Sequence, residues 1–125
     1  MVVTKTVLII DDDKDWVWML GMWLQHEGYH VESAFDAAQA ITQTINLKPD
    51  LVLLDIIMPA GDGIGVLEKL RANAKTINIP VIAITAVKDK QTEESAEKLG
   101  ISGYFVKPVD VDKLMEKLKE VLIEK

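Results

Sequence analysis

The sequence predicts a doubly wound α/β domain, in which a parallel sheet of five strands carries helices on both faces. Five short apolar segments alternate with longer segments of helical periodicity. The apolar segments show no polar alternation, as is typical of parallel strands buried on both faces. The length of 125 residues suits one domain over positions 1–125. Right-handed crossovers between parallel strands then place helices on each side of the sheet.

The expected elements follow one another as five strand–helix units. Gly28 and Gly100 follow the first and fourth helical segments, where glycine is a common C-cap. Pro49 and Pro80 precede the third and fourth apolar runs and interrupt helical structure there. Asp110 caps the last helix. We therefore expect strands at 6–10, 29–34, 51–54, 81–84 and 104–106, helices at 15–27, 36–46, 64–73, 89–99 and 110–125, and a turn-rich loop at 58–63.

The composition limits the classes of function. The net charge of −6 argues against nucleic-acid binding by this domain alone, because phosphate backbones repel an acidic surface. The chain has no cysteine, so no disulfide contributes to the fold. Its first residues lack the features of a signal peptide, and the longest uncharged stretch, 16–26, is too short to cross a bilayer. We expect a cytoplasmic protein without membrane insertion.

Polar residues stand where the predicted strands end. In a doubly wound fold the functional crevice lies at the carboxyl ends of the strands. Taken singly, each of these residues has a simpler explanation as a turn former, helix cap or solvated charge. Together they would meet at one edge of the sheet. They are Asp11, Asp12 and Asp13 after the first strand, Asp55 after the third, Thr85 after the fourth and Lys107 after the fifth.

This set of residues predicts phosphoryl chemistry at a metal site. Clustered carboxylates repel one another, and a hard divalent cation such as Mg²⁺ relieves the repulsion through oxygen ligands. A carboxylate beside Mg²⁺ can attack a phosphoryl group as a nucleophile. A lysine ammonium and a hydroxyl can stabilise the charge on the group that is transferred.

Five motifs in this order resemble the receiver domain of two-component response regulators. The motifs are the segments 7–13, 49–59, 62–63, 80–86 and 103–108, so the resemblance covers nearly the whole chain. It implies a flavodoxin-like, CheY-like fold with strand order 2-1-3-4-5. It also implies a regulatory domain that is not an enzyme and assists only its own aspartyl phosphorylation and dephosphorylation.

The resemblance also implies roles for the acidic residues. Asp55 would accept a phosphoryl group from the phosphohistidine of a sensor histidine kinase or phosphotransfer protein. Asp12 would bind Mg²⁺ directly, and Asp11 would act mainly through water. The backbone carbonyl of Ile57 would be a further ligand, so Asp55, Asp12, Asp11 and Ile57 form the implied metal site. Asp13 matches a variable position, and we expect it to be a solvated residue or a helix cap.

The remaining matched residues imply a switch. Thr85 would donate to a phosphoryl oxygen, and Lys107 would pair with another. The bond between Lys107 and Pro108 is expected to be cis. Tyr104 matches the switch aromatic of the family and would rotate inward as Thr85 moves, which would change a partner-binding surface. The simpler explanation for Tyr104 is an edge-strand aromatic residue that packs on a helix.

The first helical segment has more apolar residues than one buried face needs. No charged residue occurs between Asp15 and Glu27. A core stripe at i, i+3, i+4, i+7 and i+8 would comprise Trp16, Met19, Leu20, Trp23 and Leu24. A second apolar face would comprise Val17, Trp18, Gly21 and Met22, and we expect this face to contact a partner. The candidate partners are the helical bundle of a kinase, a second copy of the chain (a homodimer) or a flanking output domain.

Two alternative functions remain open at this point. A phosphatase of the haloacid dehalogenase class would use Asp11 and Asp13 with Thr85 and Lys107. That assignment leaves Asp55 without a role, and the acidic motif that should follow the lysine on a further strand is missing. The other alternative is a phosphate-independent interaction module of the same fold, against which the intact acceptor set argues.

Overall fold

The computed structural model describes residues 4–58, 61–86 and 88–123 and contains every predicted strand and helix. The strands are β1 (Thr6–Ile10), β2 (His30–Ala34), β3 (Leu51–Asp55), β4 (Ile57–Met58), β5 (Gly61–Asp62), β6 (Val81–Thr85) and β7 (Gly103–Val106). The helices are α1 (Lys14–His26), α2 (Ala37–Leu47), α3 (Gly63–Ala72), α4 (Lys90–Leu99) and α5 (Val111–Ile123).

Five strands form one parallel sheet in the order β2-β1-β3-β6-β7. Counted within this sheet alone, the order is 2-1-3-4-5, as the resemblance implied. The numbering differs because β4 and β5 pair as a small antiparallel hairpin within the segment that was predicted to be a loop. The central strands β1, β3 and β6 are buried along almost their whole length, which explains their uninterrupted apolar sequences.

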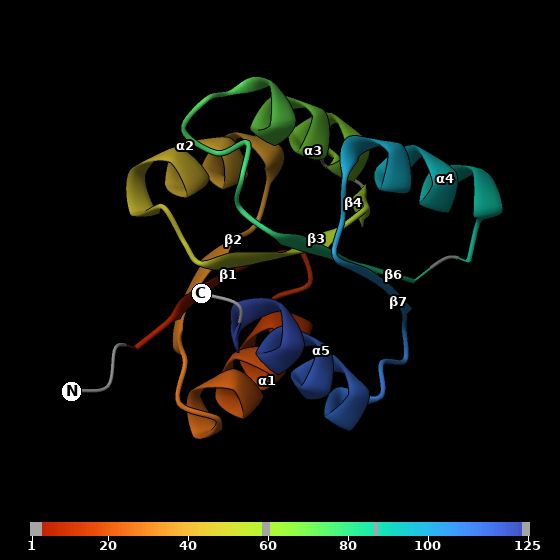
Figure 1. Cartoon of the computed structure of the whole chain (residues 1–125). Helices are drawn as coiled ribbons and strands as arrows, with labels where there is room; N and C mark the ends of the chain where they lie inside the picture. Colours follow the sequence, from red (N-terminus) through yellow and green to blue (C-terminus); the bar gives the residue numbers. More distant parts are fainter. Residues whose placement is uncertain (1–3, 59–60, 87, 124–125) are drawn as a thin grey trace.

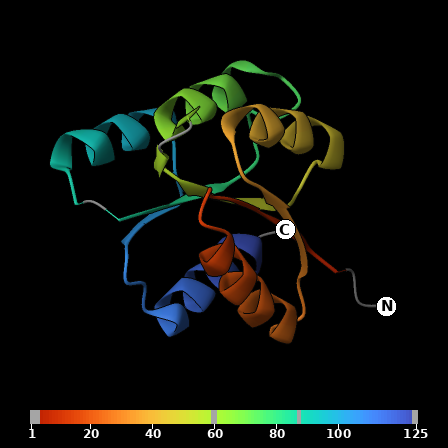
Figure 2. The ribbon, with the colours of Figure 1, turned by 180° about the vertical axis from the view of Figure 1, so that it is seen from behind.

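Helices cover both faces of the sheet. Helices α2, α3 and α4 lie on one face, and α1 and α5 lie on the other, as Figures 1 and 2 show from opposite sides. Alternate residues of each central strand point into two separate cores. In β1, Leu8 packs in the core beneath α2, α3 and α4, whereas Val7 and Ile9 pack in the core beneath α1 and α5.

Aspartate side chains cap four of the helices, which fixes where each loop becomes helical. The Trp16 N–H donates to Asp13 Oδ1 (3.1 Å) at the start of α1, so Asp13 is the helix cap that was expected. Asp36 caps α2 in the same way, Asp89 caps α4, and Asp110 caps α5 as predicted. Because α1 begins directly after the acidic loop, its cap also fixes the direction in which that loop leaves the sheet.

The prediction for the buried face of α1 was partly wrong. The side chains that face the sheet are those of Val17, Leu20 and Leu24, with Gly21 between them. Val17 and Gly21 had been assigned to the partner face, and both are buried. Trp16 is half-buried and packs on the same core.

Met19 and Trp23 had been assigned to the core, and both are exposed. The helix has apolar residues at core spacing along two directions, so periodicity alone could not choose between them. Packing against the sheet decides between them, because it buries Val17, Leu20 and Gly21. An added Cβ at Gly21 would make an ordinary contact with Val31 Cγ1 of the edge strand β2, at 3.6 Å.

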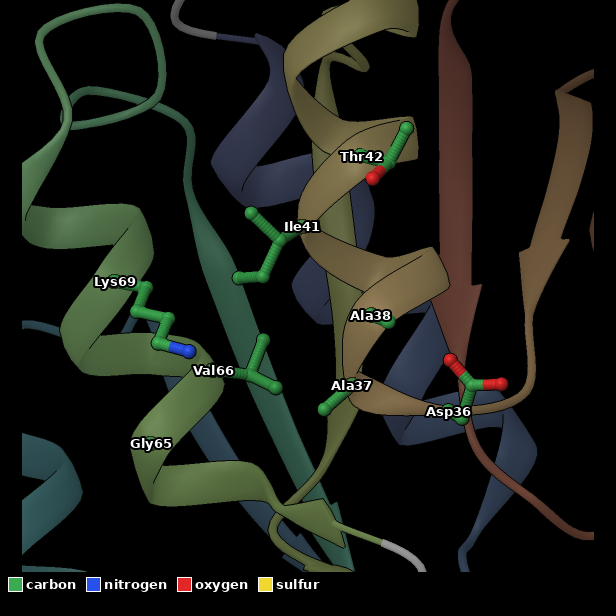
Figure 3. Close-up of a pocket in the computed structure, with 8 residues that line it drawn as sticks. All are labelled: Asp36, Ala37, Ala38, Ile41, Thr42, Gly65, Val66 and Lys69. Carbon is green, nitrogen blue, oxygen red and sulfur yellow. The ribbon is translucent and has the colours of Figure 1, made fainter.

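A groove of about 840 Å³ lies between α2 and α3, away from the acidic loop. Figure 3 shows Ala37 and Ile41 of α2 opposite Val66 and Lys69 of α3. Its apolar floor continues the core between these helices. None of the predicted site residues lines this groove.

Gly63 allows α3 to start against the end of β3. The Gly63 N–H donates to the carbonyl oxygen of Ile56 (3.1 Å). A Cβ at position 63 would collide with the backbone carbonyl oxygens of Asp55 and Ile56, which cannot move as a flexible side chain can. The backbone that carries Asp55 therefore depends on the absence of a side chain at position 63.

We expect Gly63→Ala to lower the free energy of unfolding by roughly 2–4 kcal/mol, because the backbone must shift to admit the methyl group. Gly21→Ala is the matched control, since its methyl group would make only an ordinary contact with Val31. Helix propensity should make that control neutral or up to about 1 kcal/mol more stable. Urea denaturation measures both variants. Equal effects of the two substitutions would contradict this account of Gly63.

Candidate functional site

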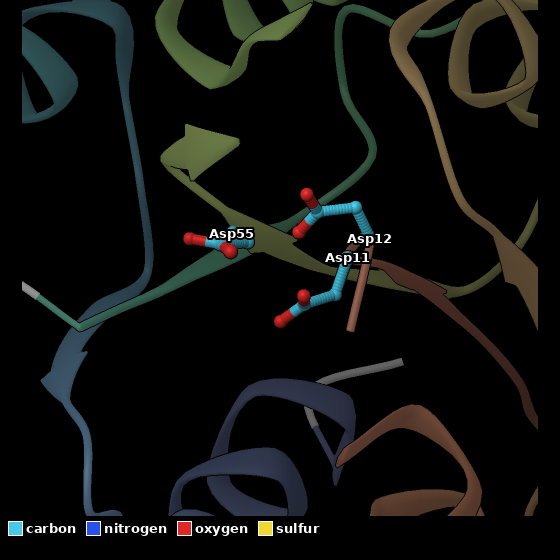
Figure 4. Close-up of side chains that lie close together, drawn as sticks. All are labelled: Asp11, Asp12 and Asp55. Atoms are coloured by element: carbon cyan, nitrogen blue, oxygen red, sulfur yellow. The ribbon is translucent and has the colours of Figure 1, made fainter. Parts of the chain in front are cut away.

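Three aspartates meet at the carboxyl edge of the sheet. Asp11 and Asp12 follow β1, and Asp55 ends β3, which is paired with β1 in parallel. Each of the three offers a carboxylate oxygen, and these oxygens all lie within 4.8 Å of one another. Figure 4 shows the three side chains converging from the two strand ends. The predicted acidic site is therefore formed by the parallel pairing of β1 with β3.

Asp11 is held in place from two sides. Its side chain is buried, with the residue 2% exposed. The Asp13 N–H donates to Asp11 Oδ1 (2.9 Å), and Lys107 Nζ lies 2.9 Å from Asp11 Oδ2. Both oxygens are thus engaged, one by the turn into α1 and one by the lysine that follows β7.

Asp55 is a buried carboxyl group with one oxygen bound by its own backbone. The residue is 6% exposed, and the Ile57 N–H donates to Oδ1 (3.0 Å). Oδ2 lies 3.9 Å from Lys107 Nζ. Burial and the charge of Asp11 raise the pKa of Asp55 from 3.8 to about 7, and Asp12 adds to this increase. The Ile57 hydrogen bond and the Lys107 charge act in the opposite direction but do not cancel the increase.

Lys107 reaches the acidic cluster from the end of β7. Its backbone N–H donates to the carbonyl oxygen of Thr85 (2.8 Å), which ties it to β6. The peptide bond between Lys107 and Pro108 is cis, as expected. The ring of Trp16 lies under the ammonium group, with Nζ 5.3 Å from the ring centroid. Trp16 thus holds the lysine by a cation–π contact.

The contact between Trp16 and Lys107 was not predicted from the sequence. Trp16 had been assigned to the core stripe of the first helix, and the edge of its ring does pack there. Nothing in the local sequence connects it with a lysine at the far end of the chain. Its position one helical turn after the Asp11 and Asp12 pair is the only signal in the sequence that places it near the site.

Thr85 and Tyr104 lie on neighbouring strands beside the cluster. Thr85 is fully buried at the end of β6. Tyr104, on β7, packs its ring against the core beneath α2, α3 and α4. Among the described residues, its buried hydroxyl has no hydrogen-bond partner. Burial raises the pKa of Tyr104, and the charges of Glu93 and Asp89 add to the increase.

The predicted switch has Tyr104 rotate inward when Asp55 is phosphorylated. The ring is already half-buried in the unmodified chain, so burying it does not require a phosphoryl group. The hydroxyl, however, lacks a partner among the described residues, and an unpaired buried hydroxyl is costly. The observed position of the Tyr104 ring therefore carries a cost in hydrogen bonding.

The structure places Asp13 outside the acidic cluster and Ile57 next to it. Asp13 is exposed, and its carboxylate caps α1, so it does not belong to the cluster. This placement removes the second acidic residue that the phosphatase alternative needs. Ile57 lies in β4 next to the cluster, and its side chain is exposed. Its backbone is thus close to Asp55, while its side chain is free to vary.

The donor set fits a hard divalent cation. All the side-chain ligand atoms in the cluster are carboxylate oxygens, and two of the three residues are buried. Magnesium binds through one or two carboxylates, with water and phosphate oxygens completing its shell. Burial and the neighbouring carboxylates raise the pKa of Asp55, and a bound cation would lower it.

Comparison with known proteins agrees with this geometry. A family model described as the response regulator receiver domain matches residues 7–119. The chain belongs to this family. It is thus a receiver domain of the kind found in two-component systems, as the motifs had implied, and its fold is CheY-like.

Two regulators illustrate the relationship. The chain is 33% identical over 116 residues to the DNA-binding dual master transcriptional regulator RpaA of Synechocystis, covering 93% of this chain and 48% of that protein. It is 33% identical over 120 residues to the phosphate regulon regulatory protein PhoB of Pseudomonas aeruginosa, covering 96% of this chain and 52% of that protein. The chain therefore spans about half the length of these relatives.

Solved structures share the fold over their whole length. A CheY-like receiver domain from Methanospirillum hungatei is 31% identical, with a TM-score of 0.91 over 98% of this chain and 96% of that one. The chemotaxis protein CheY4 of Vibrio cholerae is 26% identical, with a TM-score of 0.89 over 96% of this chain and 100% of that one. Within residues 4–58, 61–86 and 88–123, every helix of the present receiver domain is too short or too polar to span a bilayer.

The raised pKa of Asp55 predicts a stability effect that depends on pH. In the unfolded chain Asp55 ionises near 3.8, whereas in the folded domain it ionises near 7. The folded state therefore binds more protons between these values, and stability is lost as the pH rises through this range. Without divalent cations, Asp55→Asn should be more stable than wild type by roughly 1–2 kcal/mol at pH 8.

The gain from Asp55→Asn should shrink as the pH falls from 7 toward 4, because Asp55 of the folded wild type gains its proton over this range, whereas the unfolded chain gains it only near 3.8. Urea denaturation at several pH values measures this difference. Asp36→Asn is a suitable control, because that carboxylate caps α2 and is not one of the three clustered carboxylates. A gain that is the same at pH 8 and pH 4.5 would show that the asparagine acts through something other than charge.

Proposed function

We propose that this receiver domain, acting as a single unit over residues 1–125, accepts a phosphoryl group on Asp55 from a phosphohistidine. The donor is a sensor histidine kinase or a phosphotransfer protein, and the reaction requires Mg²⁺. The observation that supports this most strongly is the setting of Asp55. One of its oxygens is bound by the Ile57 N–H, and the other faces Lys107.

Asp55 Oδ2 is the nucleophile in this proposal. Oδ1 is occupied by the backbone hydrogen bond, which fixes the orientation of the carboxylate. A P–O bond forms to Oδ2 as the P–N bond to the donor histidine breaks, and its electron pair remains on the imidazole nitrogen. The raised pKa makes Asp55 more basic, and hence a better nucleophile when ionised, than an exposed aspartate.

Lys107 and Thr85 stabilise the group that is transferred. Lys107 Nζ lies between Asp11 and Asp55, so a small movement brings it from Asp11 to a phosphoryl oxygen on Asp55. Trp16 limits the movement of the ammonium group on its other side. The Thr85 hydroxyl, at the end of the neighbouring strand β6, donates to a second phosphoryl oxygen.

Asp12 and Asp55 would hold Mg²⁺ directly, with Asp11 acting through water and the Ile57 carbonyl as a further ligand. When bound, the cation neutralises the repelling carboxylates and withdraws charge from the phosphoryl oxygens. Asp12 is the least buried of the three acidic residues, as suits a ligand that shares the cation with solvent.

The phosphoryl group then changes a surface that partners recognise. Thr85 moves toward the new acceptor oxygens and leaves space beside Tyr104 on the adjacent strand. The Tyr104 hydroxyl has no hydrogen-bond partner among the described residues, so a rotamer that carries it to solvent would have a different hydrogen-bonding energy, which suits a two-state element. The domain is regulatory and catalyses only its own phosphorylation and dephosphorylation. A flanking output domain is a further partner of this surface.

With Mg²⁺ and acetyl phosphate, the wild-type chain should gain one acid-labile phosphoryl group, measured by intact-protein mass spectrometry. Asp55→Asn should lose at least about 99% of this labelling, because an amide is a far weaker nucleophile. Asp50→Asn is the matched control, since Asp50 lies before the same strand and its carboxylate binds the Thr6 N–H. Unchanged labelling of Asp55→Asn would assign the acceptor to another residue, and an unlabelled wild type would favour the phosphate-independent module.

The metal ligands are tested separately. Asp12→Ala should weaken Mg²⁺ binding by about tenfold or more, because it removes a direct carboxylate ligand. Asp13→Ala should change Mg²⁺ affinity less than about twofold, since Asp13 caps α1 and lies outside the cluster. Isothermal titration calorimetry gives both affinities. Similar losses in both variants would show that the ligands are wrongly assigned.

A further inference from the structure

Helix α1 presents an apolar patch to solvent, and the proposed phosphorylation does not use it. The patch consists of Trp18, Met19, Met22 and Trp23, whose residues are 69%, 46%, 51% and 45% exposed. A shallow cavity of about 430 Å³ lies among these four side chains and His26. A second groove runs beside it, between α1 and β2, with Val17 and Gly21 on its floor. The partner face predicted from the sequence comprised Val17, Trp18, Gly21 and Met22. It is corrected to this α1 patch, because Val17 and Gly21 are buried.

The patch is large for a domain of this size. The exposed parts of its two indoles alone amount to about 200–300 Å². The two methionines bring the patch to the upper range of about 300–600 Å² that is usual for the largest patch on a monomer. Two such patches placed face to face approach the roughly 1,000 Å² of buried surface that a specific interface needs.

The order of residue types in the patch is the same in both directions. Along the helix it reads Trp18, Met19, two buried residues, Met22, Trp23. A twofold axis brings together two identical surfaces in opposite directions, so it requires a surface that matches itself. With the axis midway between Leu20 and Gly21, two antiparallel α1 helices place Trp18 of each copy beside Met22 of the other. Trp23 then lies beside Met19, so all four tryptophan–methionine contacts form at once.

The polar residues at the ends of α1 agree with the same register. Asp15 and His26 lie three turns apart, at either end of the midline of the patch. In the antiparallel pair centred between Leu20 and Gly21, Asp15 of one copy lies level with His26 of the other, twice by symmetry. Both residues are exposed. The antiparallel arrangement also places the negative end of each helix dipole beside the positive end of its neighbour.

We propose that the α1 patch binds a second copy of this chain, forming a twofold-symmetric dimer with antiparallel α1 helices. The self-matching order of the apolar residues, the size of the patch and the pairing of Asp15 with His26 support this partner over a kinase helix. The proposal does not depend on phosphorylation of Asp55.

Sedimentation equilibrium of the whole chain tests the proposal, with protein concentrations up to about 200 µM to detect a weak interface. Wild type should show a reversible monomer–dimer equilibrium. Trp18→Glu should raise the dissociation constant by about tenfold or more, because it places a charge at the centre of an apolar contact. Ile77→Glu is the matched control, since Ile77 is 47% exposed on the α3–β6 connection and lies outside the patch. It should leave the dissociation constant unchanged.

A charge exchange tests the register and does not depend on any tryptophan variant. His26→Asp should weaken the dimer, because it faces Asp15 of the other copy. Adding Asp15→Lys to His26→Asp should restore at least the wild-type affinity, since opposite charges then face each other across the dimer. Restoration supports the antiparallel register. A double variant as weak as His26→Asp alone overturns it.

Three other results would overturn the dimer. The first is a wild type that remains monomeric at every concentration. The second is a dimer that Trp18→Glu leaves unchanged. The third is a wild type that remains monomeric while Trp18→Glu loses phosphotransfer from the phosphohistidine of a kinase. Labelling of that variant by acetyl phosphate would be unchanged. That last result would assign the patch to the kinase and would leave the proposed function of Asp55 intact.

Discussion

The repulsion among three carboxylates at one edge of the sheet is the constraint on which the rest of this domain depends. It follows from the parallel pairing of β1 with β3, which brings Asp11 and Asp12 to the same edge as Asp55. Burial disfavours the charged form of Asp55, and the charge of Asp11 adds to this effect, so Asp55 holds its proton up to a pH of about 7. A divalent cation would relieve a repulsion that the fold itself maintains.

The groups that respond to this constraint come from the other end of the chain. Lys107 pairs with Asp11, lies near Asp55 and rests on Trp16, so it is connected to both β1 and β3. Its backbone joins it to Thr85, and β6 pairs directly with β7, which carries Tyr104. A change of charge at Asp55 is therefore one or two contacts away from the strand that carries the proposed switch residue.

Most of the fold and most of the site could be predicted from the sequence. Apolar runs identify buried parallel strands, and the rule that their carboxyl ends meet identifies Asp11, Asp12, Asp55, Thr85 and Lys107. The buried face of α1 could not be predicted, because two apolar stripes have the same helical spacing and only tertiary packing against the sheet distinguishes them. The β4–β5 hairpin escaped prediction because strands of two residues have no periodicity. The contact of Trp16 with Lys107 depends on tertiary structure alone.

The most direct test of the central claim is the ionisation of Asp55 itself, measured by ¹³C NMR of its carboxyl carbon with and without Mg²⁺. Without divalent cations, this carboxyl group should titrate near pH 7. Saturating Mg²⁺ should move the titration to a clearly lower pH, because the cation favours the carboxylate form. An Asp55 that titrates near its ordinary value of 3.8 without metal, or whose titration Mg²⁺ leaves unchanged, would contradict the account.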